Sequence, residues 1–230
     1  MKVELAERIL TARAERRPIA LITWLASGEQ RLVSPLEVAE LGGLSALATD
    51  AFRFDRSGTY PSDDGEIFIR VFNPALRLIV IGAVHATQFL LPLARLAGFE
   101  VTVIDPRTAF ASPERFPDAE ILAEWPDDAL ARRPIDARTA FVALTHDPKI
   151  DDPALTIALR AEPFYIGALG SKRTHAGRVE RLTALGFAEA GIARIHAPIG
   201  LDIGAQGPAE IAISIMAEIV AVLRGRPLAR

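Results

Sequence analysis

Short continuous runs of apolar residues recur from residue 78 onward, and most are followed by a segment with helical periodicity. The runs predict five buried strands, at residues 78–81, 101–104, 121–122, 140–144 and 164–168. The other segments predict helices at residues 85–97, 127–132, 153–160, 171–185 and 208–224. Strands that alternate with helices at this spacing favour βαβ units and a parallel sheet. We therefore predict an α/β domain, a Rossmann-like doubly wound parallel sheet, over residues 75–230.

The first 74 residues lack this regular alternation and predict a small N-terminal α+β domain. Apolar positions among charged ones predict an amphipathic helix over residues 2–16, which Pro18 ends. The remaining expected elements are strands at 19–25, 31–33 and 66–72, a helix at 34–49 and a loop at 53–65. Asn73 and Pro74 mark the boundary, so the domains are predicted at 1–74 and 75–230.

The last predicted helix is apolar almost all round, and its few polar side chains form one stripe. Glu210, Ser214 and Glu218 are spaced by four residues, so they share one face of the helix. A helix this apolar is buried on most of its sides. Packing against the sheet alone explains the pattern, and so does packing against the sheet and a second copy of the chain in a homodimer.

Composition excludes several classes of protein. The chain has 230 residues, a net charge of −3 and few aromatic residues, which argues against a nucleic-acid-binding face. It has no cysteine, so disulfides and thiolate metal sites are excluded. No apolar run is long enough to span a membrane, and the charged segment from Met1 to Arg17 does not resemble a signal peptide. We expect a cytoplasmic protein with no nucleic-acid and no membrane partner.

All four histidines lie in stretches rich in glycine or aspartate, and most of these stretches follow predicted strands. The loops after the strands of an open parallel sheet line one crevice, and that crevice binds the ligand. The sequence therefore predicts a single site assembled from several loops. The four stretches are residues 82–85, 145–153, 167–175 and 196–205.

The first stretch stands where a dinucleotide-binding fingerprint would stand. Gly82 is its only glycine, because Val84 takes the second glycine position and Thr87 the third. Asp105, at the end of the next strand, is placed to bind a ribose hydroxyl. With His85, these residues indicate a degenerate nucleotide or pterin pocket. The alternative is an ordinary βαβ unit in which Gly82 makes the turn and Asp105 caps a loop.

The second stretch follows the fourth predicted strand. His146 and Asp147 precede the helix and should face the crevice, where such a pair could ligate a metal or act as acid and base. A loop pair with satisfied hydrogen bonds is the alternative. Asp151 or Asp152 is expected to cap the following helix, with Pro153 at its first position.

The third stretch is the strongest local signal, because a glycine-containing turn leads directly into a basic helix start. Free backbone N–H groups at a helix start attract anions, and cations there are unfavourable to the helix dipole. We predict a site for phosphate or a similar oxyanion, with a solvated basic helix start as the alternative. The site residues concerned are Gly167, Gly170, Ser171, Lys172, Arg173 and His175, and Arg178 is a further cation in the first turns of this helix.

The fourth stretch has little predicted regular structure. Asp202 stands between apolar neighbours, so we expect it to be partly buried and paired, as a support for the site. His196 is expected to reach the crevice. No Gly-x-Ser-x-Gly, His-Glu-x-x-His or cysteine motif occurs, so no catalytic residue and no metal ligand is assigned.

Three of these segments together resemble the C-terminal domain of the XdhC/CoxI family. They run from Thr145 to Leu155, from Tyr165 to His175 and from Arg194 to Ala205. The resemblance implies a maturation factor that binds molybdenum cofactor, as molybdopterin or its nucleotide form. It would deliver the cofactor to an apo-molybdenum hydroxylase of the xanthine dehydrogenase or carbon monoxide dehydrogenase type. A cysteine desulfurase is a further implied partner, and the role is that of a cofactor-insertion chaperone rather than an enzyme.

Two features depart from the family pattern. The glycine-rich loop of the family usually resembles Gly-Ala-Gly-His, whereas Val84 replaces the second glycine in this chain. Longer members carry an N-terminal Gly-Gly-Cys motif, and this chain has no cysteine. We therefore expect a short member in which no thiolate handles the cofactor.

The expected pocket combines residues of all four stretches. Lys172 and Arg173 are predicted to hold the phosphate and Asp105 a hydroxyl or pterin nitrogen, while the histidines and Asp147 line the pocket. Two alternatives stay open. One is an NAD(P)-dependent oxidoreductase with a degenerate dinucleotide loop, which Val84 disfavours, and the other is a protein-interaction module with a vestigial pocket.

Overall fold

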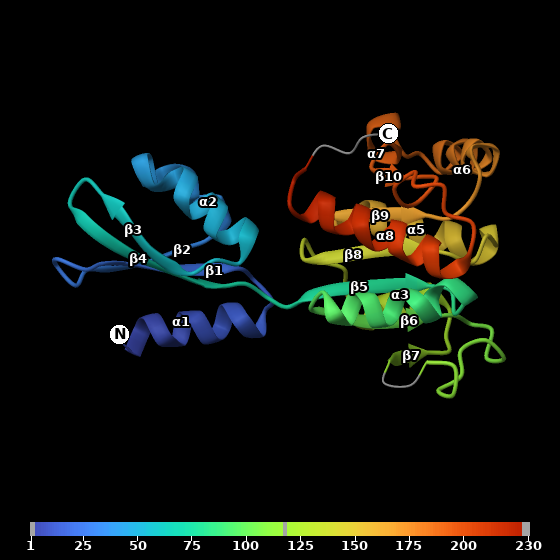
Figure 1. Ribbon diagram of the computed structural model, residues 1–230, viewed down its shortest axis with the longest axis horizontal. Helices are drawn as coiled ribbons and strands as arrows, with labels where there is room; N and C mark the ends of the chain where they lie inside the picture. The colour runs from blue at the N-terminus through green and yellow to red at the C-terminus, as the bar shows by residue number, and fades with distance from the viewer. Residues whose placement is uncertain (1–2, 117–118, 227–230) are drawn as a thin grey trace. The chain divides into compact units, whose positions relative to one another are not determined.

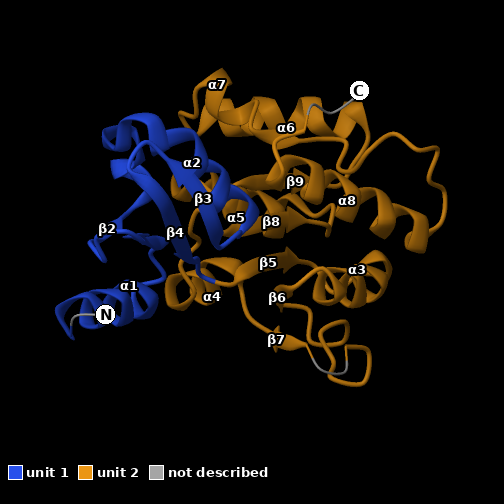
Figure 2. Ribbon diagram, turned by 60° about the vertical axis from the view of Figure 1, so that its left-hand side comes forward, with its two compact units in different colours: residues 1–74 blue, residues 75–230 orange. Residues whose placement is uncertain are grey.

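The computed structural model describes residues 3–116 and 119–226. The chain folds as two compact units, residues 1–74 and 75–230 (Figure 2). Each unit has its own sheet and its own apolar core. Lys2, the first residue of the predicted N-terminal helix, lies outside the described residues.

The first unit is a four-stranded antiparallel sheet in the order β2-β1-β4-β3, with helices on both faces (Figure 1). Successive side chains of a strand point to opposite faces. On β1, Ile19 and Leu21 therefore pack with α1, whereas Ala20 and Ile22 pack with α2. The elements are α1 (Val3–Ala14), β1 (Ile19–Trp24), β2 (Gln30–Val33), the 3-10 helix η1 (Pro35–Leu44), α2 (Ser45–Phe54), β3 (Gly58–Ser62) and β4 (Gly65–Phe72).

Two segments of the first unit differ from the prediction. The helix expected at 34–49 is instead η1 followed by α2, because Gly42 has a φ of 56° and a ψ of −123°, which no helix can continue. The loop expected at 53–65 contains the strand β3. This strand lies at the sheet edge, has no fully buried residue and contains a proline, so no apolar alternation marks it.

The second unit is a six-stranded parallel sheet in the order β10-β9-β8-β5-β6-β7, which confirms the predicted α/β class. Helices α3 and α8 lie side by side on one face, and α4, α5 and α6 cover the other (Figure 1). Strands covered on both faces are apolar throughout, which is why they are visible in the sequence. The elements are β5 (Leu76–Ile81), α3 (His85–Leu96), β6 (Phe99–Ile104), β7 (Glu120–Leu122), α4 (Pro126–Arg132), β8 (Thr139–Ala143), α5 (Pro148–Ala161), β9 (Tyr165–Ala168), α6 (Lys172–Ala184), α7 (Glu189–Ile192), β10 (Ile195–His196) and α8 (Pro208–Leu223).

Helix α5 begins one turn earlier than predicted. The side chain of Asp147 caps it by accepting a hydrogen bond from the Lys149 N–H (2.9 Å), and Pro148 is its first residue. The prediction that Asp151 or Asp152 caps this helix is therefore wrong, since both residues lie inside it. The prediction also lacked α7 and the sixth strand β10, which are too short to produce a periodic pattern.

The carboxylate of Glu218 joins α8 to the strands beneath it. Glu218 is 1% exposed and accepts hydrogen bonds from the Tyr165 hydroxyl (2.5 Å) and the Gly200 N–H (2.8 Å). Its other oxygen lies 3.1 Å from Nδ1 of His196, whose ring stacks on Tyr165. Burial by itself would raise the pKa of Glu218, but these hydrogen bonds outweigh burial and lower the pKa. The contact fixes α8, β9, β10 and the segment after β10 relative to one another.

Replacing Glu218 by Gln should lower the free energy of unfolding by about 1.5–3 kcal/mol at neutral pH, because hydrogen bonds to a buried charged acceptor are lost. The folded pKa lies below the unfolded value of 4.5, so the stabilisation by the ionised carboxylate is complete above that pH. It disappears as the pH falls from 4.5 through the folded pKa, and the stability of Glu218→Gln should vary less over this range.

Urea unfolding followed by circular dichroism, at neutral pH and in acid, measures both effects. The matched control is Glu180→Gln, which changes an exposed glutamate of α6. An equal loss of stability in the two variants would contradict the assigned role of Glu218.

Candidate functional site

The topology of the second unit places a switch point between β5 and β8. These strands are neighbours, but the chain leaves β5 toward β6 on one side and leaves β8 toward β9 on the other. Open α/β sheets commonly bind ligands outside the carboxyl ends of the strands at such a switch point. Gly82, directly after β5, has a φ of 115°, and a Cβ there would lie 2.8 Å from Cγ2 of Thr145. The loops after the two strands are therefore in close contact, which only glycine permits.

Asp105, at the end of β6, holds the loop after β5. Its carboxylate is fully buried and accepts hydrogen bonds from the Ala83 N–H (2.8 Å), the Arg107 N–H (3.0 Å) and the Arg107 guanidinium. Burial would raise the pKa of Asp105, but these hydrogen bonds outweigh it and lower the pKa. Both oxygens are engaged by the protein, so the geometry favours the alternative in which Asp105 caps a loop over a direct contact with a ligand.

The loop after β8 is held in the same way by Asp151. This buried carboxylate accepts hydrogen bonds from the Thr145 hydroxyl (2.6 Å) and the His146 N–H (3.1 Å), and burial raises its pKa. His146 is exposed and has a left-handed φ of 62°, which these hydrogen bonds support. Asp147 caps α5, so the predicted acid–base or metal-binding pair with His146 is replaced by a capping role.

The start of α6 has the predicted form. Oγ of Ser171 caps the helix by accepting a hydrogen bond from the Thr174 N–H (3.2 Å), and Gly170 has the positive φ of the preceding turn. Lys172 and Arg173 are exposed. The helix start therefore presents backbone donors and two solvated cations on one turn.

Further along α6, two polar side chains point inward. Nη2 of Arg178 donates a hydrogen bond to the Leu169 carbonyl (3.0 Å), and the residue is 2% exposed. His175, one turn earlier, is partly buried, and its pKa is lowered by burial and by the charge of Arg178. Burial also lowers the pKa of Arg178, against the opposite effect of nearby Asp151 and Asp152.

The second unit contains a cavity of about 530 Å³ between the start of α6, the segment 197–205 and α8. Lys172 and Leu169 line it on the α6 side, and Glu218 lines it on the α8 side. Backbone and apolar side chains of the segment 197–205 form much of its wall. Its volume is typical of small-molecule sites.

Three predicted residues near this cavity are placed differently from expectation. Asp202 lines the cavity but is exposed, so the predicted burial is wrong. His196 is hydrogen-bonded through Nδ1 to Oε1 of Glu218 (3.1 Å). Gly167 lies inside β9, and a Cβ there would lie 2.5 Å from Cδ1 of Ile199. Its role is to let the segment after β10 pack over the strand.

The predicted residues follow the carboxyl edge of the sheet, but they do not share one cavity. Within the described residues, Lys172 and Asp202 are the predicted ones that line the 530 Å³ cavity. The group around the switch point consists of Gly82, His85, Asp105, His146 and Asp147. The group near the cavity consists of Gly167, Gly170, Ser171, Lys172, Arg173, His175, His196 and Asp202.

The prediction missed two of the buried carboxylates that organise this edge. Asp151 was expected only as a cap, and Glu218 was not assigned to the site. Arg178 was expected among the cations of a basic helix start, and its burial was not predicted. Glu218 had a visible signal, because it is one of few polar residues in an apolar helix. Arg178 lies three residues after His175, which places both on one face of α6, and this spacing is also readable in the sequence.

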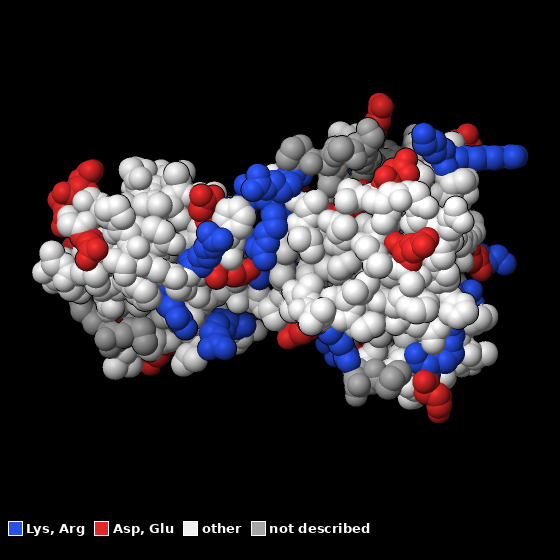
Figure 3. Space-filling view, in the orientation of Figure 1, with Lys and Arg blue, Asp and Glu red and all other residues white. Residues whose placement is uncertain are grey.

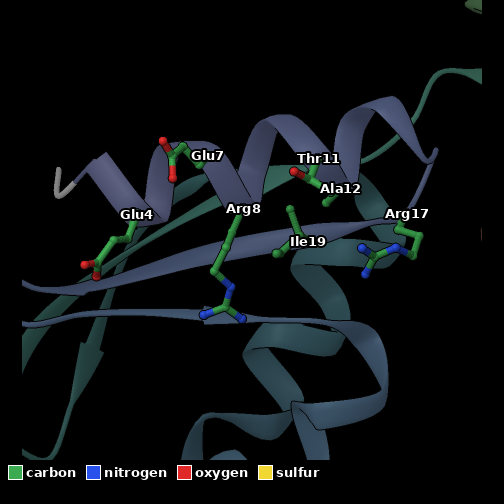
Figure 4. Close-up of a pocket in the computed structure, with 7 residues that line it drawn as sticks. All are labelled: Glu4, Glu7, Arg8, Thr11, Ala12, Arg17 and Ile19. Carbon is green, nitrogen blue, oxygen red and sulfur yellow. The ribbon is translucent and has the colours of Figure 1, made fainter.

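The first unit has a cavity of its own, of about 420 Å³, along α1. Figure 4 shows Arg8 extending from the helix toward the strands, with Ile19 between it and Arg17. Glu4 and Glu7 line the same cavity, so its charges are mixed. No predicted site residue lies in it.

Across residues 3–116 and 119–226, no three histidine, aspartate or glutamate side chains are close enough together to hold a metal ion. In the same residues, no helix combines the length and the apolar character needed to cross a membrane.

Comparison with known proteins connects this geometry to a family. Residues 78–219 match the family model of the XdhC Rossmann domain. The protein YqeB of Escherichia coli (strain K12) is 35% identical over 186 residues, which cover 81% of this chain and 34% of YqeB. The molybdenum cofactor insertion chaperone PaoD of the same strain is 32% identical over 151 residues, which cover 66% of this chain and 41% of PaoD. The chain thus spans less than half the length of either relative.

A solved structure agrees with these matches. The crystal structure of a xanthine dehydrogenase from Bacillus halodurans aligns with a TM-score of 0.66 at 25% identity. The alignment covers 97% of this chain and 65% of that chain. The predicted resemblance is confirmed: the chain belongs to the XdhC/CoxI family, and its second unit carries the Rossmann domain of that family.

Proposed function

We propose that this protein binds molybdenum cofactor in the cytoplasm and delivers it to an apo-molybdenum hydroxylase. The observation that carries the proposal is the 32% identity, over 151 residues, with the molybdenum cofactor insertion chaperone PaoD. The likeness to a xanthine dehydrogenase structure supports a hydroxylase of that type as the client. The role is that of a carrier, and no residue is assigned a catalytic step.

The residues at the carboxyl edge of the second unit suit such a cargo. The cavity of about 530 Å³ has a volume typical of ligand sites, and Lys172 stands at its wall. The start of α6 offers backbone N–H groups to a phosphate. Buried nitrogens of Arg178 without partners among the described residues add further donors. The cofactor supplies redox chemistry only once it is in the hydroxylase, so the task of these residues is to bind, orient and shield it.

The proposal divides the predicted residues by task. Lys172 and Arg173 are exposed, so they attract the phosphate from solution. His85 and His146 are exposed at the switch point and line the approach. Asp105 and Asp151 act indirectly, because their carboxylates hold the loops after β5 and β8.

The same proposal includes partners. The apo-hydroxylase accepts the cofactor, and a cysteine desulfurase supplies sulfur to the cofactor. A homodimer forms through the outer face of α3 and α8, where Phe89 and Leu96 of α3 and Ile213 of α8 are exposed apolar side chains. Figure 3 shows few charged side chains over these two helices. Light scattering on the purified protein measures whether the dimer forms.

Anaerobic incubation with free molybdenum cofactor should load the purified protein. Gel filtration followed by assays of pterin and molybdenum should find both in the protein peak, in a stoichiometric amount, because the cavity and the α6 start remain with the protein. A folded protein that elutes without either component would contradict the proposed function.

Replacing Lys172 and Arg173 together by Ala should weaken cofactor binding about 5- to 30-fold, since two exposed cations contribute about 0.5–1 kcal/mol each. The effect should shrink as salt is added, because exposed charges are screened. The measurement is equilibrium binding at several ionic strengths. Arg95→Ala is the control, because Arg95 is an exposed cation in the last turn of α3, at the opposite edge of the sheet. Equal affinity in the double variant and this control would remove the two cations from the site.

A further inference from the structure

Buried polar atoms without a hydrogen-bond partner concentrate on one face of α6. Within the described part of the chain there are five such side-chain atoms, and three belong to His175 (Nδ1) and Arg178 (Nε and Nη1). The two residues are three positions apart in the helix, so their side chains are neighbours. Most buried polar atoms in proteins have a hydrogen-bond partner, so three buried atoms without one on the same face of a helix require an explanation.

The surrounding protein does not supply the missing acceptors. The described partner of the Arg178 guanidinium is the Leu169 carbonyl, which takes only Nη2. The two carboxylates whose charges act on Arg178 are engaged elsewhere. Asp152 accepts two hydrogen bonds from Arg181 (2.5 and 3.2 Å), and Asp151 accepts those of the loop after β8. A buried guanidinium left in this state is costly, and an acceptor from outside the chain would relieve the cost.

We propose that Arg178 and His175 form a binding site for a phosphate group, which completes the hydrogen bonds that the protein leaves open. The proposal rests on the proposed function only for the identity of the molecule that carries the phosphate. Inorganic phosphate, the pyrophosphate of a nucleotide and the phosphate of a pterin cofactor share this chemistry.

An anionic oxygen suits the site better than other groups. Guanidinium nitrogens are donors only, and their planar fork matches the oxygens of a phosphate. The Arg178 side chain reaches back to Leu169, just before the α6 cap, where the helix dipole also favours negative charge. The nearby acids are already engaged by the protein, because Asp152 is paired with Arg181 and Asp151 accepts hydrogen bonds from the loop after β8.

The site adjoins the cavity of the second unit. Leu169, whose carbonyl accepts from Arg178, also lines that cavity, and so does Lys172. Leu169 is thus shared by the cavity wall and by the contact that holds Arg178. Because Arg178 is 2% exposed, the side chains around it move when the phosphate enters, and His175 is the member of the pair that solvent already reaches.

The first test uses the wild-type protein and two simple probes. Inorganic phosphate and pyrophosphate are titrated into isotope-labelled protein, and the Nε–H resonance of Arg178 is followed by NMR. A saturable shift of this resonance is expected, because Nε gains an acceptor. A resonance that does not respond to either probe overturns the proposal.

The second test uses a pair of Arg→Lys variants. Arg178→Lys keeps the positive charge but removes Nε and Nη1, so pyrophosphate affinity should fall about 10- to 100-fold. Arg181→Lys, one turn later on the same helix, is the matched control and should bind as the wild type does. Equal affinity in both variants overturns the proposal. If Arg178→Lys does not fold, His175→Ala replaces it, with an expected loss of about 3- to 10-fold from one hydrogen bond.

Loading with molybdenum cofactor separates this site from the proposed function. Cofactor uptake and pyrophosphate affinity that are both unchanged in Arg178→Lys would leave the carrier role intact and overturn the phosphate site. Pyrophosphate binding through Arg178 in a protein that takes up no cofactor would support the phosphate site and contradict the carrier role. A fall in both pyrophosphate and cofactor binding, with Arg181→Lys unaffected, supports both.

Discussion

Buried carboxylates hold the loops at the carboxyl edge of the second unit. Asp105, Asp151 and Glu218 are almost entirely buried, and a buried charge is tolerated only when it is fully hydrogen-bonded. Each accepts a backbone N–H from a different loop, namely those after β5, β8 and β10. The shapes of the three loops are therefore set by acids inside the protein.

The fold was predictable wherever burial is two-sided. Central strands such as β5 and β8 are covered by helices on both faces, so they are continuous apolar runs in the sequence. The elements that the prediction missed are those whose burial leaves no continuous apolar run or helical periodicity in the sequence. Strand β3 is a half-exposed edge strand, β10 has two residues, and Gly42 divides a helix through its φ and ψ alone. Such features depend on pairing and backbone angles, which hydrophobic periodicity does not report.

The placement of the unusual residues along the sheet was predictable, and the contacts of their side chains were less so. The sequence pattern placed the unusual residues along one edge, but it did not show the direction of their side chains. Asp147 and Asp152 each precede a proline, so both match the start of a helix equally well, and only packing decides that α5 begins at Pro148. Asp202 has apolar neighbours in the chain yet is exposed in space. Local context identifies a residue as unusual, and tertiary contacts decide what it does.

Because the acids are used internally, donors and cations remain for a ligand. They fall into two classes on α6: Lys172 and Arg173 are exposed, whereas His175 and Arg178 point inward. Exposed cations attract an anion from a distance, and dissolved salt shortens the range of this attraction. They therefore govern the approach of an anion. Buried donors are screened much less, and they act only after the anion has replaced the groups around them. In the proposed carrier, capture and retention would thus be separate steps. A client that offered the phosphate better partners would draw the cargo away from the buried donors, and the exposed pair would not need to change.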